Sequence, residues 1–400
     1  MKVLILTPWF PRRPGEQFAE YIYAAALALK HAGTKVRVLV TRPWAPPLLR
    51  STDAHEPLCA GAFAADFPVL AVQHLSLPGN RLRSIANRLY LRAVVPEVRR
   101  IYQEWRFDVV HAHMEMAAAA ALAADLSVPV LTTIHGLNTE PRLYAPRQLA
   151  FVSRALRGSA RVILVGDPLR EHFTRIAGTA SNFRVIYNGF TWPAELSANR
   201  KIAFQRPLRI LSVSNLHEGK GVELNLRALA ALKAKGVRDW RYTIIGGGYL
   251  MRDLRALASK LDLDAQVTFT GPVRHSDIYA HLLQADVFLL PSYREAFGVA
   301  YLEAMAAGLY TVGIAGQGPA AFIRHRENGL LLPPRDAAAI ESALEEIMRN
   351  PEPAERAASQ GRKDVFSQFT WGRHAELLME QYGQTRREFE ETMRHRASAA

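Results

Sequence analysis

The sequence predicts an α/β protein made of two domains, each built on a parallel β-sheet. The chain has 400 residues, which is too long for one ordinary domain and suits two of about 200 each. It opens with a strand, a helix and a second strand, over Val3 to Leu6, about Gln17 to His31, and Val36 to Val40. The same alternation restarts at Ile210, and alternating strands and helices are typical of parallel sheets.

Between the two halves the periodicity fades, and Pro, Ser, Asn and charged residues collect, as in an interdomain linker. A last helix is expected after Phe369 and Thr370, where it could cross back to the first domain, and the terminal residues should fray. The expected division is a first domain over 1–190, a linker over 191–207, a second domain over 208–368, the returning helix over 369–388 and a tail over 389–400.

In the first half, histidines mark the ends of two expected strands. One strand ends in His111 and His113, and the next runs from Val128 to Ile134, directly before His135. The carboxyl ends of parallel strands meet at one edge of a sheet, where ligands bind. His135 is therefore a candidate base, metal ligand or hydrogen-bond donor, with a satisfied structural histidine as the alternative. The three histidines could hold zinc, but no acidic D-x-D motif accompanies them, and we expect no metal.

The most informative stretch covers residues 286–308 and reads DVFLLPSYREAFGVAYLEAMAAG. Its apolar start predicts a buried strand, Pro291 and Ser292 predict a turn, and a helix follows that Gly308 would end. The start of this helix offers free backbone N–H groups, which suit oxyanions and sugar hydroxyls. These groups belong to Ala296, Phe297, Gly298 and Val299.

Two carboxylates lie in the same stretch. Glu295 is in the turn and Glu303 is one to two turns into the helix, so both can face one cleft some distance apart. Such a pair can hold two polyols, one on each side of a bound phosphate. A solvated helix face is the alternative for two carboxylates at this spacing.

Two glycine-bearing turns follow strands in the second half. In SNLHEGKG, residues 214–221, Gly219 allows close backbone approach and Lys220 offers a positive charge to a diphosphate. Gly246 and Gly247 follow another strand and fit either a tight turn or a ligand contact. They lack the G-x-G-x-x-G spacing, which argues against NAD or FAD.

In its setting of strand, turn and Ala-rich helix, the Glu295 and Glu303 pair resembles the E-x7-E signature of a family. That family comprises the retaining nucleotide-sugar glycosyltransferases of group 4. The resemblance implies the GT-B architecture, two Rossmann-like domains with parallel sheets facing a central cleft. It also implies that Glu295 holds hydroxyls of the donor sugar and Glu303 the ribose of the nucleotide. His135 matches a histidine near the donor sugar in this family.

Other segments are similar to the same family, with two departures. Residues 214–221 resemble its G-R-L-x-x-x-K-G segment, so Lys220 would neutralise the leaving diphosphate, while Asn215 stands where the arginine would be. The run VTFTGPV, ending at Val273, resembles the segment whose backbone pairs with the nucleobase. Ala320 falls near a place where many relatives carry an acidic residue. These departures put donor recognition in question.

The net charge of +13 predicts an anionic partner, which could be nucleic acid, acidic lipid or a phosphorylated substrate. No helix-turn-helix, zinc or aromatic-basic motif supports nucleic acid. A basic stripe fits either an anionic membrane surface or a solvated helix face. It comprises Arg81, Arg88, Arg92, Arg99 and Arg106.

The expected localisation depends on whether the sequence contains a signal peptide or a membrane-spanning segment. The apolar start of the chain is too short for a signal peptide, no segment is expected to span a bilayer, and the single Cys59 suits a reducing compartment. We therefore expect a cytoplasmic protein, and the basic stripe adds the alternative of a peripheral position on the inner face of the membrane.

By the resemblance, the protein transfers a sugar from a nucleotide-diphosphate sugar to an acceptor hydroxyl with retention, without a resident cofactor. The loop after the first strand carries Trp9, Phe10, Arg12 and Arg13, which would lie either on the rim of the cleft or, for the aromatics, in the packing of the domain. A basic, aromatic rim of this kind favours a lipid-linked or envelope saccharide as acceptor. A nucleotide-sugar epimerase of the same fold and a non-catalytic binding module remain alternatives.

Overall fold

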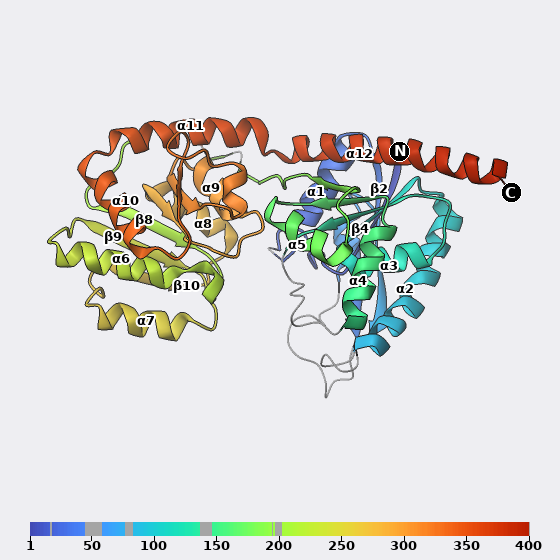
Figure 1. Cartoon of the computed structure of the whole chain (residues 1–400), viewed down its shortest axis with the longest axis horizontal. Coiled ribbons are helices and arrows are strands. Elements are labelled where there is room, and N and C mark those ends of the chain that lie inside the picture. Colours follow the sequence, from blue (N-terminus) through green and yellow to red (C-terminus); the bar gives the residue numbers. More distant parts are fainter. Residues whose placement is uncertain are drawn as a thin grey trace. The chain divides into compact units, whose positions relative to one another are not determined.

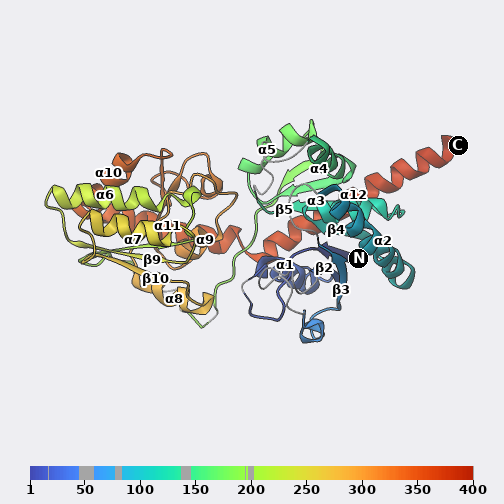
Figure 2. The same ribbon diagram turned by 90° about the horizontal axis from the view of Figure 1, so that it is seen from below.

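The computed structural model describes residues 1–16, 18–44, 58–76, 83–136, 146–193, 195–196 and 202–399. The chain forms two compact units, each with its own parallel sheet and helices (Figures 1 and 2). The first unit holds residues 1–189 and 371–400, and the second holds residues 190–370. The predicted α/β class with two parallel sheets is confirmed.

The first unit is organised by a sheet in which every described pair of neighbouring strands is parallel, in the order β3-β2-β1-β4-β5-β6-β7. From β1 the chain proceeds outward to β2 and β3, and then returns to the other side of β1 as β4. This reversal makes a switch point between β1 and β4, where the loops after the two strands diverge. The strands are β1 Lys2–Thr7, β2 Lys35–Trp44, β3 Val69–Leu75, β4 Val109–His113, β5 Val130–Ile134, β6 Arg161–Leu164 and β7 Phe183–Val185.

Helices cover both faces of this sheet, because side chains alternate along each buried strand. In β1, Val3 and Ile5 belong to the core that packs beneath α1 and α12, whereas Leu4 and Leu6 belong to the core beneath α2 and α3. The helices are α1 Glu20–His31, α2 Arg83–Trp105, α3 Met114–Ala123, α4 Pro146–Gly158, α5 Pro168–Ala177 and α12 Trp371–Ala399. A 3-10 turn, η3, covers Ala60–Phe63.

The second unit repeats the plan with strand order β10-β9-β8-β11-β12-β13, so its switch point lies between β8 and β11. Its strands are β8 Leu208–Val213, β9 Trp240–Ile245, β10 Val267–Gly271, β11 Val287–Leu289, β12 Tyr310–Ile314 and β13 Leu330–Leu332. Its helices are α6 Val222–Ala234, α7 Met251–Lys260, α8 His275–Gln284, α9 Val299–Ala306, α10 Ala337–Arg349 and α11 Glu352–Gln368, with 3-10 turns η5 Glu218–Lys220 and η6 Gly318–Ala321.

Several expected elements differ from the observed ones. A proline is expected either to kink a helix or to start a new one, but α2 continues through Pro96. Pro96 itself is exposed. The last helix runs on to Ala399, past its expected end at 388 and through the segment 389–399 that was assigned to the tail. Of the Arg stripe, Arg81 lies outside the described residues.

The long helix α12 is fastened to the first sheet by polar contacts. The Tyr382 hydroxyl is fully buried and lies 2.6 Å from His111 Nδ1. The guanidinium of Arg161 donates to both carboxylate oxygens of Glu388, at 2.6 and 2.7 Å. Packing of α12 against α1 completes the core on that face. The C-terminal segment is thus an integral part of the first unit.

We predict that Tyr382→Phe lowers the free energy of unfolding by about 1–2 kcal/mol, because it leaves the buried His111 Nδ1 without its partner. Urea titration followed by circular dichroism measures the loss. Tyr249→Phe is the matched control, since Tyr249 is 70% exposed. Equal stability of the two variants would contradict the assigned role of the Tyr382 hydroxyl.

Candidate active site

The switch point of the second sheet carries an ion pair between two predicted site residues. Lys220 ends the 3-10 turn that follows β8, and Glu295 lies in the loop that follows β11. Lys220 Nζ donates to Glu295 Oε2 at 2.6 Å, and the side chains are 16% and 14% exposed. Residues 75 positions apart in the chain are therefore brought together where a ligand is expected in an open α/β sheet.

Close backbone packing holds these two loops together. Gly219 O accepts hydrogen bonds from Tyr293 N at 2.9 Å and from Ser292 Oγ at 3.1 Å. A Cβ on Gly221 would lie 2.5 Å from Pro291 O, and its φ of +66° is a left-handed conformation that suits glycine. The glycines of the segment 214–221 thus have a structural reason: they let the Lys220 turn lie against the Glu295 loop.

A third loop fixes the backbone of Glu295. Gly318 N donates to Glu295 O at 2.9 Å, and Glu295 N donates to Gln317 Oε1 at 3.2 Å. A Cβ on Gly318 would lie 2.5 Å from the Phe297 backbone, so no side chain fits there. Ala320 lies in the turn η6, which continues this loop.

The predicted start of α9 is present with the geometry of an open helix N-terminus. Gly298 is the N-cap residue with φ +96°, and Val299 is the first helical residue. Phe297 is buried, with its ring 5.5 Å from that of Phe322 and 6.3 Å from that of Phe369. The ring therefore anchors the loop, and the N–H groups that follow it begin the helix beside Glu295.

Glu303 has a partner that the sequence did not reveal. Its carboxylate is buried, and Glu303 Oε1 lies 2.7 Å from His275 Nε2. His275 is the first residue of α8, and its ring packs 5.2 Å from that of Tyr279. The only sequence signal was a histidine just after the VTFTGPV run. Val273, at the end of that run, is partly exposed.

The glycines after β9 approach the loop after β8. Leu216 N donates to Gly247 O at 2.7 Å, and a Cβ on Gly246 would lie 1.9 Å from Ser214 O. Gly246 also has φ +128°, so the tight-turn interpretation has a direct physical basis. Asn215 lies on this loop with an exposed side chain.

His135 lies in the first unit within a row of stacked imidazoles. His113 Nδ1 lies 2.7 Å from His135 Nε2, with the two rings nearly parallel, and His111 stacks on His113 at 4.6 Å. Burial lowers the pKa of His135 to about 3, so the ring is neutral near pH 7. His135 Nδ1 is shielded from solvent and has no hydrogen-bond partner among the described residues.

Within the described ranges, no group of three or more His, Cys, Asp or Glu side chains is placed to hold a metal ion.

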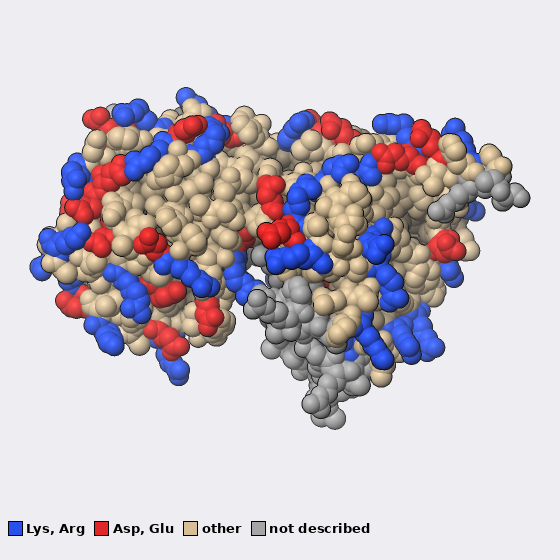
Figure 3. Space-filling view, viewed as in Figure 1, with Lys and Arg blue, Asp and Glu red and all other residues tan. Residues whose placement is uncertain are grey.

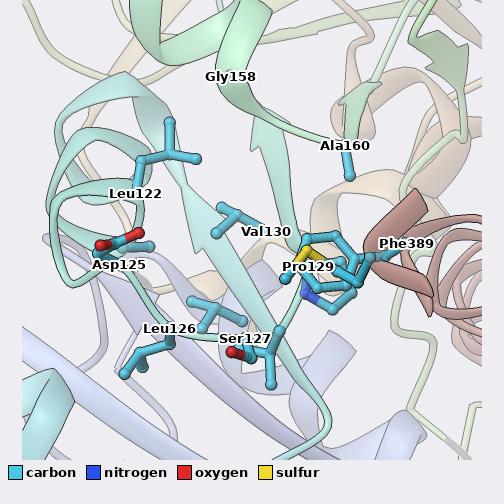
Figure 4. Close-up of a pocket in the computed structure, with 13 residues that line it drawn as sticks. Leu122, Asp125, Leu126, Ser127, Pro129, Val130, Gly158, Ala160 and Phe389 are labelled. Carbon is cyan, nitrogen blue, oxygen red and sulfur yellow. The ribbon is translucent and has the colours of Figure 1, made fainter. Parts of the chain in front are cut away.

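A cavity of about 420 Å³ lies near the start of β5, between the ends of α3 and α4 and Phe389 of α12 (Figure 4). It lies at the opposite edge of the sheet from His135 and includes none of the predicted site residues.

Two parallel-sheet units with polar loops at their switch points define a protein of the GT-B class. Anabaena HepE, solved in complex with UDP and with UDP-glucose, superposes with TM-scores of 0.71 and 0.68. The identity is 18%, over 96% of this chain and all of that chain, which shows the fold alone.

The chain belongs to the glycosyltransferase family that the sequence resembles. The family model "Glycosyl transferases group 1" matches residues 196–364, and "Glycosyltransferase Family 4" matches residues 19–191. Glycogen synthase of Mycobacterium tuberculosis is 32% identical over 289 residues, covering 67% of each chain. The "putative colanic acid biosynthesis glycosyltransferase WcaL" of Escherichia coli is 38% identical over 250 residues, covering 60% of this chain and 61% of the relative.

If Glu303 holds the ribose, as the family resemblance implies, His275→Ala should weaken the preference for a nucleoside diphosphate over its 2′-deoxy form by about tenfold, because Glu303 loses the group that orients its carboxylate. Dissociation constants from isothermal titration calorimetry give the preference. His275→Asn, which keeps an N–H donor, should restore part of it. His281→Ala, on the same helix, is the control. An unchanged preference in His275→Ala would show that the contact only supports packing.

Proposed function

We propose that this enzyme is a retaining glycosyltransferase that moves a sugar from a nucleotide-diphosphate sugar to an acceptor hydroxyl. The observation that carries the proposal is the Lys220–Glu295 pair at the switch point of the second sheet. Both residues come from segments that resemble donor-binding segments of the family. The UDP-glucose bound to HepE supports a nucleotide sugar as the donor class.

In the proposed site each residue has one task. Lys220 and the N-terminus of α9 at Gly298 stabilise the diphosphate as negative charge develops on it. Glu295 accepts hydrogen bonds from the donor sugar, Glu303 from the ribose, and His135 contacts the donor sugar. Orientation of the two substrates supplies the rest of the rate acceleration.

Retention of the anomeric configuration is compatible with a reaction in which no side chain of the protein acts as the base. The acceptor oxygen attacks the anomeric carbon on the face from which the diphosphate leaves, and its proton passes to the departing phosphate oxygen. The lowered pKa of His135 makes this imidazole a poor proton acceptor, which agrees with such a route. The proposal needs no resident cofactor or metal ion, since Lys220 provides the positive charge.

The ion pair also implies an exchange of partners on binding. Lys220 and Glu295 neutralise each other in the free protein. A diphosphate that approaches Lys220 competes with the Glu295 carboxylate for the ammonium. The freed carboxylate can then accept hydroxyls of the donor sugar. Donor binding therefore replaces one charged contact with two ligand contacts.

We further propose that the acceptor is a lipid-linked or envelope saccharide reached at an anionic membrane surface. The first unit carries 28 Lys and Arg against 18 Asp and Glu, whereas the second carries 22 against 19. Basic side chains gather over α2 and α4 (Figure 3). No described helix combines the length and apolarity needed to cross a bilayer. Exposed arginines of α2 and α4 include Arg88, Arg92, Arg99, Arg147, Arg154 and Arg157.

A non-catalytic binding module is a second candidate, and two residues favour it. Asn215, exposed in its loop, and Ala320 depart from the family pattern. Such a module would bind a nucleotide sugar and turn none over. Hydrolysis of the donor, or transfer to any acceptor, would exclude it.

We predict that one of UDP, GDP, ADP, TDP or their sugar conjugates raises the melting temperature, since a ligand of the native state stabilises it. Lys220→Ala and Glu295→Gln should each lower the turnover of that nucleotide sugar by about a hundredfold or more. Differential scanning fluorimetry measures binding, and release of the nucleoside diphosphate measures turnover.

Circular dichroism provides the folding control for both variants. Arg227→Ala, an exposed change in the same unit, should keep full activity. Full activity of both Lys220→Ala and Glu295→Gln would overturn the assigned site. The absence of any shift in a folded sample would remove the proposed donor class.

We predict that replacing Arg88, Arg92 and Arg99 with Ser abolishes most sedimentation with phosphatidylglycerol vesicles, because each basic side chain near an anionic surface contributes about 1 kcal/mol. Replacing Arg227, Arg238 and Arg252 of the second unit with Ser makes the same charge change on exposed positions and should leave sedimentation intact. Equal sedimentation of the two triple variants would rule out this face as the membrane contact.

A further inference from the structure

The switch point of the first sheet carries a carboxylate that the proposed function leaves unused. Strand β4 ends at His113, and helix α3 begins at Met114 without an intervening loop. Met114 has φ +70°, which lets the chain turn from strand to helix within one residue. The next residue, Glu115, therefore lies in the first turn of α3, at the carboxyl edge of the sheet.

The Glu115 carboxylate has an unmet hydrogen-bonding capacity. Its Oε2 atom is shielded from solvent and has no hydrogen-bond partner among the described residues. The carboxylate does accept a hydrogen bond from its own backbone N–H. Burial raises the pKa of Glu115, while the charge of Arg83 opposes that shift. Buried polar atoms almost always have a hydrogen-bond partner, so an unpartnered Oε2 atom at this position requires an explanation.

The position of Glu115 parallels that of Glu295 in the second unit. Glu295 follows β11, the strand that lies beside β8 at the switch point, and Glu115 follows β4, the strand that lies beside β1. In an open α/β sheet, ligands bind at this crevice. Glu295, however, is paired with Lys220, whereas the Oε2 atom of Glu115 has no hydrogen-bond partner among the described residues.

Polar and charged groups of α2 lie near the Glu115 carboxylate, which interacts electrostatically with Tyr90 and with Arg83. Tyr90 of α2 donates to Thr41 Oγ1 at 3.4 Å, and the ring of His74 packs against Tyr90 at 4.9 Å. Strands β2, β3 and β4 and helix α2 thus bring hydrogen-bonding groups to one region of the first unit.

We propose that Glu115 binds hydroxyl groups of a neutral sugar in the acceptor. This inference rests on the proposed glycosyl transfer and names the part of the acceptor that the first unit recognises. In its ionised form the carboxylate only accepts hydrogen bonds, so in that form it selects O–H donors and repels phosphate or carboxylate groups. The sugar hydroxyls would supply the partner that Oε2 lacks in the free protein. Any phosphate of the acceptor must therefore bind away from Glu115.

The test uses the full chain, the nucleotide sugar that stabilises it, and three acceptor probes: octyl β-D-glucopyranoside, octyl α-D-mannopyranoside and octyl β-D-galactopyranoside. At least one should be glycosylated, as detected by mass spectrometry. Glu115→Gln should lower kcat/KM for that glycoside by about tenfold or more, because hydrogen bonds to a charged group are lost. The melting shift caused by the donor should stay the same. A loss of kcat/KM for the glycoside with an unchanged melting shift for the donor would distinguish acceptor recognition from a structural role of Glu115.

Glu171→Gln is the matched control, because Glu171 lies in the first turn of α5 in the same unit and its side chain is 85% exposed. Should Glu115→Gln fail to fold, Glu115→Asp keeps the charge and moves it, and it should also weaken acceptor use. Unchanged acceptor kinetics, or an equal loss of donor binding, would overturn the proposal. Donor hydrolysis with none of the three glycosides accepted would overturn it as well. Absence of any donor binding would remove the proposed function and this inference together.

Discussion

The ion pair between Lys220 and Glu295 is the contact on which the candidate site depends. Partly buried ion pairs contribute little to stability, because the desolvation of both groups offsets their attraction. Its presence at a switch point is therefore better explained by function than by folding. The pair keeps an ammonium and a carboxylate largely desolvated and close together, as the proposed exchange of partners with a diphosphate and a sugar requires.

The precision of this contact comes from backbone packing rather than from side chains. Gly221 lets the Lys220 turn approach Pro291, and Gly318 lets a third loop hold the backbone of Glu295. Each approach leaves no room for a Cβ atom. Loops that are fixed in this way lose little conformational entropy when a ligand binds, which favours orientation of the reacting groups.

Local sequence predicted much of this site because its residues lie in short, self-contained segments. Lys220 and Glu295 each follow a strand within one loop, so the strand pattern alone places them at a sheet edge. The partner of Glu303 was missed because His275 is 28 residues away and belongs to α8, a helix without a strong signal. Glu115 was missed because a single acidic residue at the start of an Ala-rich helix resembles a solvated one. Its burial depends on α2 and on neighbouring strands, which no local pattern encodes.

Charged residues are distributed differently at the candidate donor site and on the surface of the first unit. At the candidate donor site the charged groups are paired: Lys220 with Glu295, and Glu303 with His275. The net positive charge instead belongs mostly to the first unit, where the outer face of α4 carries arginines without an acidic residue. Exposed charge of this kind is screened over about 8 Å at physiological ionic strength, so it acts on surfaces that the protein meets. By these proposals, the basic first unit would bring the enzyme to an anionic surface, while the Glu115 carboxylate within it would bind neutral hydroxyls.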